Sequence, residues 1–306
     1  MVDASVVPKP RSIEMTGKSW HRSKWLPFWF LFPAMLVLLA FQVTPSLYAF
    51  YLSVTRLRAG ETEMVGLRNY ERLIRSPSFI ESLQNTAIYA GAFVVLTVVL
   101  GMMLALLLNR RFKYTELYLV MIFIPWVLSD VVTGTMWRWL FQPTYGIAQT
   151  FIDSNLPFIG SALYTDPNGG AMAIVVAASV WQALAFTTIL SLGALQTVPN
   201  EVLESSALDG ANRAQQFLYV TLPIIRPTLL VMILLVSIRA INSVGLIFTT
   251  TGGGPGRATQ MASIFLLKTA WEQGNFGVGA AVSVIMLFVN ITLAIFYLFL
   301  MRRKAG

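Results

Sequence analysis

Cysteine is absent from this chain of 306 residues, and His21 is its only histidine. The missing thiols exclude a disulfide framework, a thiolate nucleophile and a metal site built from cysteine. A single histidine in a polar N-terminal segment also excludes a histidine-based metal site or catalytic triad. The sequence therefore predicts neither a resident metal nor a catalytic centre.

Charged residues are also scarce, at 12% of the chain, against about 25% in soluble domains. Hydrophobic residues make up 56%, more apolar surface than a fold of this size can hide from water. The formal net charge of +8 does not indicate a nucleic-acid partner, because the basic residues cluster beside apolar runs. These proportions predict a protein of the lipid bilayer.

Six apolar runs are long enough for the ~20 helical residues that cross ~30 Å of hydrocarbon. We therefore expect an all-α integral membrane protein whose six transmembrane helices form one domain, residues 26–301. Residues 1–25 and 302–306 are expected to be terminal tails. The predicted spans are 26–52, 85–109, 117–141, 171–195, 228–250 and 278–301.

The distribution of lysine and arginine predicts the orientation of these spans. If the spans alternate, thirteen of the 22 basic residues lie on the side of both termini and seven on the opposite side. Basic residues accumulate on the cytoplasmic side of membrane proteins. Both tails and the loop 197–227 are therefore expected in the cytoplasm, with 53–84 and 142–170 facing outward.

The loop 197–227 is an extended polar stretch between spans, and its first half indicates a short helix. Pro199 suits the first helical position, where its missing N–H costs nothing. Glu201 and Glu204 would then lie in the first turn, at the positive end of the helix dipole. Asp209 and Gly210 supply the break that ends this helix.

The second half of the loop indicates another helix. Asn212 is a candidate N-cap, and Gln215 three residues later completes a capping-box pattern. Leu222-Pro223 is expected to end this element or to kink it into the next span. A structured helix–turn–helix between spans is typical of a surface that docks a soluble partner.

The residues of this loop resemble the EAA loop of the permeases of ABC importers, and the likeness is greatest to carbohydrate permeases of the maltose and glycerol-phosphate type. The matching residues are Glu204-Ser205-Ser206, Asp209-Gly210-Ala211 and Leu222-Pro223. Similar landmarks between residues 30 and 300 are Gly66-Leu67, Asn69-Tyr70, Asn85-Thr86, Trp137-Arg138-Trp139, Tyr145-Gly146, Trp181-Gln182 and Thr251-Gly252-Gly253-Gly254-Pro255. Ser205 and Ser206 replace two small alanines of the family pattern, and serine is small enough to keep the packing.

The resemblance implies a type I ABC importer permease fold with a cytoplasmic EAA-like coupling helix. It also implies a heterodimer with a second permease, two ATPase subunits that hydrolyse ATP with Mg, and an extracytoplasmic solute-binding protein that delivers a sugar or sugar derivative. The membrane would be the inner membrane of a bacterium or archaeon. The residues expected to couple to the ATPase are Glu204, Ser205, Ser206, Ala207, Leu208, Asp209, Gly210 and Ala211.

The glycine cluster 252–256 is the one stretch that could be compared with a phosphate-binding loop. A P-loop needs Gly-Lys followed by serine or threonine, whereas Gly256 is followed by Arg257 and Ala258. A turn at the end of the fifth span is the better interpretation. We expect the chain to lack its own ATP site and to be a non-catalytic subunit.

Polar residues inside the spans predict the substrate pathway, because a charge at mid-bilayer costs roughly 2.5 to 3.5 kcal/mol. On a continuous fifth span, the offsets of Arg239, Asn242, Ser243, Thr249 and Thr250 would place all five on one helical face. We interpret that face as a pathway wall.

The third span carries a similar row in Asp130, Thr133, Trp137 and Phe141. An aromatic face suits the apolar face of a sugar ring, although Trp137 is equally consistent with a membrane-interface anchor. For Gln182, Thr188, Ser283 and Asn290, interhelical hydrogen bonding is favoured over a role in the pathway. The predicted pathway residues are Asp130, Thr133, Trp137, Trp181, Gln182, Arg239, Asn242 and Ser243.

Asp130 and Arg239 are expected at similar depths, about 20 Å and 16 Å from the inner ends of two straight spans. They could form a salt bridge that neutralises both charges. Alternatively, Arg239 could bind a polar or anionic group of the cargo. The sequence does not distinguish a neutral sugar from a phosphate, sulfonate or other acidic derivative, and it does not identify the partner subunits.

Two other classes of function remain to be weighed. An ion-coupled secondary transporter of a small polar solute is disfavoured by six spans without an inverted repeat, although Asp130 is the kind of residue it would use. An integral-membrane enzyme is disfavoured by the lack of cysteine, clustered acids and a second histidine.

Overall fold

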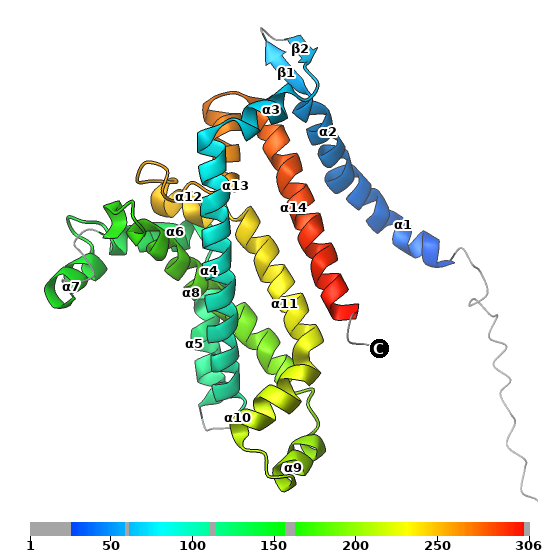
Figure 1. Cartoon of the computed structure of the whole chain (residues 1–306), viewed down its shortest axis with the longest axis vertical. Helices are drawn as coiled ribbons and strands as arrows, with labels where there is room; N and C mark the ends of the chain where they lie inside the picture. Colours follow the sequence, from blue (N-terminus) through cyan, green and yellow to red (C-terminus); the bar gives the residue numbers. More distant parts are fainter. Residues whose placement is uncertain (1–25, 59–60, 111–113, 157–162, 303–306) are drawn as a thin grey trace, which may run out of the picture. The chain divides into compact units, whose positions relative to one another are not determined.

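The computed structural model describes residues 26–58, 61–110, 114–156 and 163–302 (Figure 1). The predicted tails lie outside these residues, His21 and Lys304 included, except for Arg302 at the end of the last helix. Residues 1–48 and 49–306 form two separate units. In the described part, five helices are long and apolar enough to cross a membrane, or six when one bent pair is counted as a span.

The first span is an apolar helix at Phe28–Ser53. It consists of α1 (Leu26–Leu38), a π-helical turn η2 (Leu39–Val43) and α2 (Thr44–Ser53). Pro45 follows the π turn, so the carbonyl that its ring would strike, that of Phe41, belongs to the widened segment. The helix therefore continues through the proline.

The second unit begins, after the last turn of α2, with a hairpin and a short helix. The strands β1 (Thr55–Arg58) and β2 (Glu61–Met64) pair antiparallel, with Thr55 opposite Met64. The helix α3 (Arg68–Ile74) follows. The amide of Asn69 donates to the carbonyls of Ser53 at 2.8 Å and Thr55 at 2.9 Å. Asn69, one of the family-like landmarks, thus fixes the hairpin to the end of α2.

Long helices then form the body of this unit. The helix α4 (Pro77–Leu108) starts eight residues before the predicted span, because Ser76 caps it and Pro77 occupies its first turn. The helix α8 (Gly170–Leu195) matches the prediction closely, and α14 (Phe276–Arg302) does so within two residues. At the crossing of α4 and α8, Gly101 lies directly against Thr187, where a larger residue would collide.

The third and fifth spans are not the single helices that we predicted. The third consists of α5 (Thr115–Val127) and α6 (Asp130–Leu140), which are bent by 96°. The fifth consists of α11 (Leu222–Asn242) and α12 (Gly245–Thr251), separated at Ser243 by extended backbone. Each break falls at serine, whose side chain competes for backbone hydrogen bonds.

Shorter elements connect the spans. The segment 142–170 contains the helix α7 (Ile147–Asn155) and a 3-10 turn η4 (Leu163–Thr165). Asp166 accepts hydrogen bonds from the backbone N–H groups of Asn168 (2.9 Å) and Gly170 (3.0 Å). These N–H groups stabilise the carboxylate and lower the pKa of Asp166.

The remaining elements come before and after the fifth span in the sequence. α9 (Asn200–Leu208), α10 (Arg213–Gln215) and the π turn η5 (Gln216–Thr221) precede α11, and α13 (Ala262–Leu267) with η6 (Lys268–Glu272) precedes α14. Within the second unit, the hairpin and α3 lie at one end of the long helices, and α9 and α10 at the other (Figure 1).

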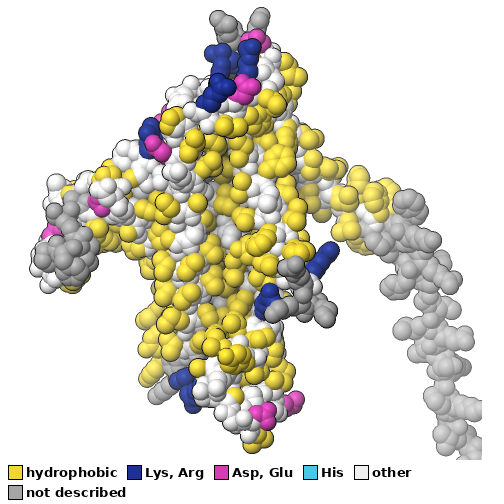
Figure 2. All heavy atoms as spheres, viewed as in Figure 1, with side chains coloured by type: hydrophobic (Ala, Val, Ile, Leu, Met, Phe, Trp, Pro, Cys, Tyr) yellow, Lys and Arg dark blue, Asp and Glu magenta, His cyan; other side chains and the backbone are white. Residues whose placement is uncertain are grey.

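The surface of the long helices agrees with a membrane environment. Figure 2 shows hydrophobic side chains along the length of these helices, whereas most charged side chains visible on this face gather towards the ends. The buried core between α4, α8 and α11 includes Tyr89, Phe93, Val175 and Met232. Tyr89 and Phe93 stack with ring centroids 5.7 Å apart.

Candidate functional site

The two breaks in the spans are stabilised by side chains that bond the freed backbone. The carbonyl of Leu128, at the end of α5, accepts a hydrogen bond of 2.9 Å from Nε2 of Gln182 on α8. The carbonyl of Ser243, after α11, accepts one of 2.6 Å from Oγ of Ser263 on α13. Backbone groups within a bilayer must find partners inside the protein. Gln182 and Ser263 therefore satisfy the carbonyls that the two breaks leave without a helical partner in apolar surroundings.

Arg239 joins the first of these breaks to α11. Its Nη2 donates to Oε1 of Gln182 at 2.7 Å and forms an ion pair with Oδ1 of Asp130 at 3.6 Å. The side chains of Arg239 and Asp130 remain 39% and 44% exposed, whereas Gln182 is 2% exposed. The structure thus contains the salt bridge between Arg239 and Asp130 that the sequence left open. Gln182 is nevertheless the closer partner of Arg239. The cluster Asp130, Gln182 and Arg239 is called the polar cluster below.

Asp130 lies in the polar cluster because of the break before it. It is the first residue of α6, whose N-cap Ser129 accepts from the backbone of Val132 at 3.3 Å. A carboxylate in the first helical turn is stabilised by the helix dipole. Gly245, at the start of α12, gives it room: a β carbon there would lie 3.0 Å from Cβ of Asp130.

The predicted polar face along the fifth span is wrong, because the helix ends at Asn242. Thr249 and Thr250 belong to α12, and Thr250 is buried. Asn242 and Asn290 exchange amide hydrogen bonds of 3.4 Å and 3.3 Å between α11 and α14. The interhelical role that we weighed for Asn290 is therefore present, and the depth estimate from straight spans does not apply.

Aromatic residues pack together on α6 and α8, the helices that carry Asp130 and Gln182. Trp137 stacks on Phe141, with ring centroids 5.7 Å apart and planes 11° apart, and it meets Trp181 at 6.1 Å. Trp137 also packs against the buried core, which an interface anchor alone would not do. Thr133 is fully buried, and its hydroxyl has no partner among the described residues. In this chain Thr133 lies beneath the surface that a solute could touch.

The predicted coupling helix is present as α9, with two corrections. Pro199 is its N-cap and not its first residue, because the ψ of Pro199 is 136°, which is extended. Glu201 is in the first turn, but Glu204 lies one turn further on. The helix ends at Leu208, and Gly210 follows two residues later with a φ of +85°, which suits glycine. The N–H groups of Gly210 and Ala211 donate to the carbonyls of Ala207 and Ser206, both at 3.0 Å, which is a Schellman motif.

The second predicted helix is also present. Asn212 and Gln215 form the reciprocal capping box, with bonds of 2.8 Å and 3.0 Å. The π turn η5 then precedes Pro223, so the helix continues from Arg213 to Asn242 and does not end at the proline. Gln216 on η5 donates to the carbonyl of Leu203 on α9 at 3.3 Å. This bond holds α9 against the start of the fifth span.

The outer face of α9 is open. Leu208 is 90% exposed, and Glu204, Ser205 and Asp209 are exposed beside it. Leu203 on the other side packs against the buried core. An exposed leucine flanked by carboxylates, on a helix fixed by its Schellman motif and by the bond from Gln216, is suited to docking a partner protein.

A helical membrane permease is the class of protein that these features define: broken spans around a polar cluster, and a fixed, exposed helix in one loop. Residues 97–306 match the family described as the inner membrane component of binding-protein-dependent transport systems, and the chain belongs to that family. The resemblance drawn from the sequence and the type I ABC importer permease fold are therefore confirmed. The ion-coupled transporter receives no support.

Individual relatives extend over nearly the whole chain. The trehalose/maltose transport system permease protein MalF of Thermococcus litoralis is 30% identical over 290 residues, covering 93% of this chain and 96% of that protein. A probable ABC transporter permease of Pyrococcus horikoshii is 31% identical over 285 residues, covering 91% and 97%. A permease chain in the crystal structure of a bacterial alginate ABC transporter has the same fold, with a TM-score of 0.75 at 21% identity over 91% of this chain and 94% of that one.

Proposed function

We propose that this chain is one of two permease subunits in an ATP-driven importer of a sugar or sugar derivative. One of two ATPase subunits would dock on α9 and the two would hydrolyse ATP with Mg, while this chain would bind neither ATP nor Mg. An extracytoplasmic binding protein would deliver the solute at the opposite end. The complex would lie in the inner membrane of a bacterium or archaeon, with both termini of this multi-pass chain in the cytoplasm.

The observation that carries this proposal is the geometry of α9. The helix is fixed by the Schellman motif at Gly210 and by the bond from Gln216, yet its outer face with Leu208 is exposed. Displacement of a docked ATPase would reach α11, because α10 and η5 lead directly into α11 and Gln216 on η5 donates to the carbonyl of Leu203 on α9. The sugar class rests on the relatives, among which MalF is named as a trehalose/maltose permease.

The solute would pass the polar cluster during alternating access. Asp130 and Arg239 keep about two fifths of their side-chain surface open, so they can contact a solute while remaining paired. Trp137 on α6 and Trp181 on α8 contact each other and would offer the aromatic faces that sugar rings favour. Asn242 and Ser243 complete the proposed pathway.

Variants of α9 test the coupling role. Glu204→Lys reverses a charge on the docking face, and Gly210→Pro removes the N–H that closes the Schellman motif. Both should leave the permease inserted and assembled with its partner permease while abolishing stimulated ATP hydrolysis and uptake. Glu116→Lys, an equal charge reversal at an exposed site in the first turn of α5, is the control and should transport normally. Full uptake by both α9 variants would refute the proposal.

A further inference from the structure

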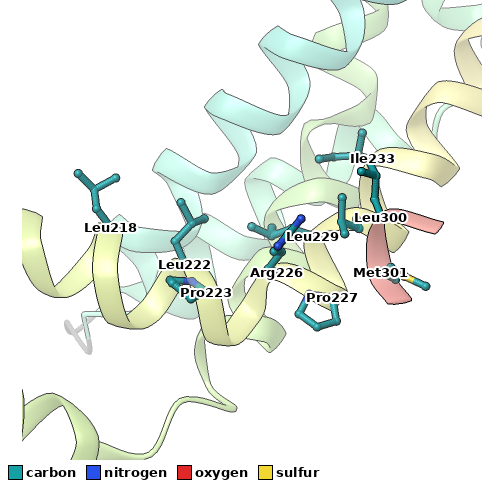
Figure 3. A pocket seen from close by; sticks show the side chains of 10 residues that line it. Leu218, Leu222, Pro223, Arg226, Pro227, Leu229, Ile233, Leu300 and Met301 are labelled. Atoms are coloured by element: carbon teal, nitrogen blue, oxygen red, sulfur yellow. The ribbon is translucent and has the colours of Figure 1, made fainter. Parts of the chain in front are cut away.

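A groove lies between α11 and α14, near the end of the helices that carries α9. It has a volume of about 600 Å³ and extends from η5 along the first turns of α11 to the last turn of α14 (Figure 3). Nine of its ten lining residues are apolar, and the tenth is Arg226. They are Leu218, Leu222, Pro223, Arg226, Pro227, Leu229, Leu230, Ile233, Leu300 and Met301.

Arg226 is the feature that an ordinary apolar groove lacks. Its side chain is half-buried among these residues (Figure 3), and no acidic group within the described part of the chain forms an ion pair with it. A guanidinium beside hydrocarbon is stabilised by an anion that can accept several of its planar N–H donors. The groove thus combines one cationic group with an apolar wall.

Pro227 adds a hydrogen-bond acceptor close to Arg226. It lies inside α11 and has no N–H, so the carbonyl of Pro223 loses the donor that a regular helix places four residues on. A ligand with a donor group next to its anion would find this acceptor near Arg226.

The groove faces away from the proposed pathway. Arg226 and Arg239 are thirteen residues apart on one helix, which places them ~140° apart around its axis. Arg239 points to the polar cluster on α6 and α8, so Arg226 lies on the side of α11 that faces α14 and the membrane. A transported solute is therefore not the natural occupant.

We propose that the groove binds one anionic phospholipid, whose phosphate pairs with Arg226 and whose acyl chain lies against Leu229, Leu230, Ile233 and Leu300. The charge is complementary, an acyl chain matches the wall, and a hydroxyl of a glycerol headgroup can donate to the carbonyl of Pro223. A basic pocket between spans is a known physical basis for binding such headgroups. The cytoplasmic leaflet follows from the proposed orientation, but the site itself does not depend on the transport function.

The test uses the intact transporter complex, purified and placed in bilayers of phosphatidylglycerol, phosphatidylcholine or their mixture. Native mass spectrometry counts the lipids that remain bound. The wild type should retain phosphatidylglycerol in preference to phosphatidylcholine, and Arg226→Gln should weaken that retention about tenfold. Arg110→Gln, at the same end but outside the groove, should retain the lipid as the wild type does.

A second measurement identifies the occupant without altering Arg226. The chain has no cysteine, so Leu300→Cys places one thiol on the groove wall. A photoreactive label on that thiol should crosslink to phosphatidylglycerol. Crosslinking to the second permease instead, or equal lipid retention by Arg226→Gln and the wild type, would overturn the proposal.

Discussion

Removing Arg239 tests the polar cluster, since one guanidinium connects α11 to both α8 and α6. Arg239→Ala deletes the 2.7 Å bond to Gln182 and the 3.6 Å ion pair with Asp130. A hydrogen bond to a charged group contributes about 1.5 to 3 kcal/mol to stability. The ion pair, with both side chains about two fifths exposed, contributes at most about 1 kcal/mol. Gln182 should therefore account for most of the loss.

A double-mutant cycle measures these contributions separately. The free energy of unfolding is determined in mixed micelles for Arg239→Ala, Gln182→Leu, Asp130→Asn and the corresponding double variants. The coupling of Arg239 with Gln182 should exceed its coupling with Asp130 by about 1 kcal/mol or more. A smaller coupling to Gln182 than to Asp130 would refute the reasoning.

Uptake measurements complement the cycle. Arg239→Ala should lower uptake more than it lowers the yield of assembled complex, because the residue lines the proposed pathway. Adding Asp130→Asn should recover yield, since it removes the carboxylate left without its cation. Normal uptake by a well-assembled Arg239→Ala complex would remove Arg239 from the pathway.

Three further predictions concern packing, pH and topology. Gly134→Ala should lower the free energy of unfolding by about 1 to 3 kcal/mol, because the new β carbon would lie 2.7 Å from the carbonyl oxygen of Leu246. The control Gly91→Ala, whose β carbon would meet nothing within 4 Å, should leave the free energy of unfolding unchanged or raise it. Equal unfolding free energies for the two variants would contradict this prediction. The pKa of Asp166 is lowered in the folded protein, so the wild type should be more stable than Asp166→Asn above about pH 4. This difference in stability should be lost as the pH falls through the folded-state pKa of Asp166. A wild type that stays more stable than Asp166→Asn at lower pH would disprove the prediction. A cysteine at exposed Ser154 should react with an impermeant maleimide on intact cells, and labelling only after permeabilisation would reverse the orientation.

The sequence predicted the spans whose hydrophobic runs are uninterrupted, and it missed both breaks. Apolar composition continues across Leu128 and across Ser243, so hydropathy alone cannot reveal a break. A local signal was present at the first one: Pro125 removes a donor, and Ser129 followed by Asp130 is a helix-start pattern. The second break gives a weaker signal, in Ser243 followed two residues later by Gly245.

The coupling loop was predicted more fully than the polar cluster because its signals are local. The Asn212 to Gln215 capping box and the turn at Gly210 depend on neighbours within a few residues. The bond from Gln182 to the carbonyl of Leu128 joins residues 54 apart and exists only because the third span is broken. The bond between Arg239 and Gln182 joins residues 57 apart, so it could not be inferred from local sequence signals either.

The most direct test of the central claim is uptake into vesicles that contain the complete complex. ATP-dependent uptake of the solute is measured with its binding protein present, once with an ATPase inhibitor and once with an ionophore that dissipates ion gradients. The account predicts that uptake collapses with the inhibitor and survives the ionophore. Uptake that survives the inhibitor and collapses with the ionophore would contradict an ATP-driven importer.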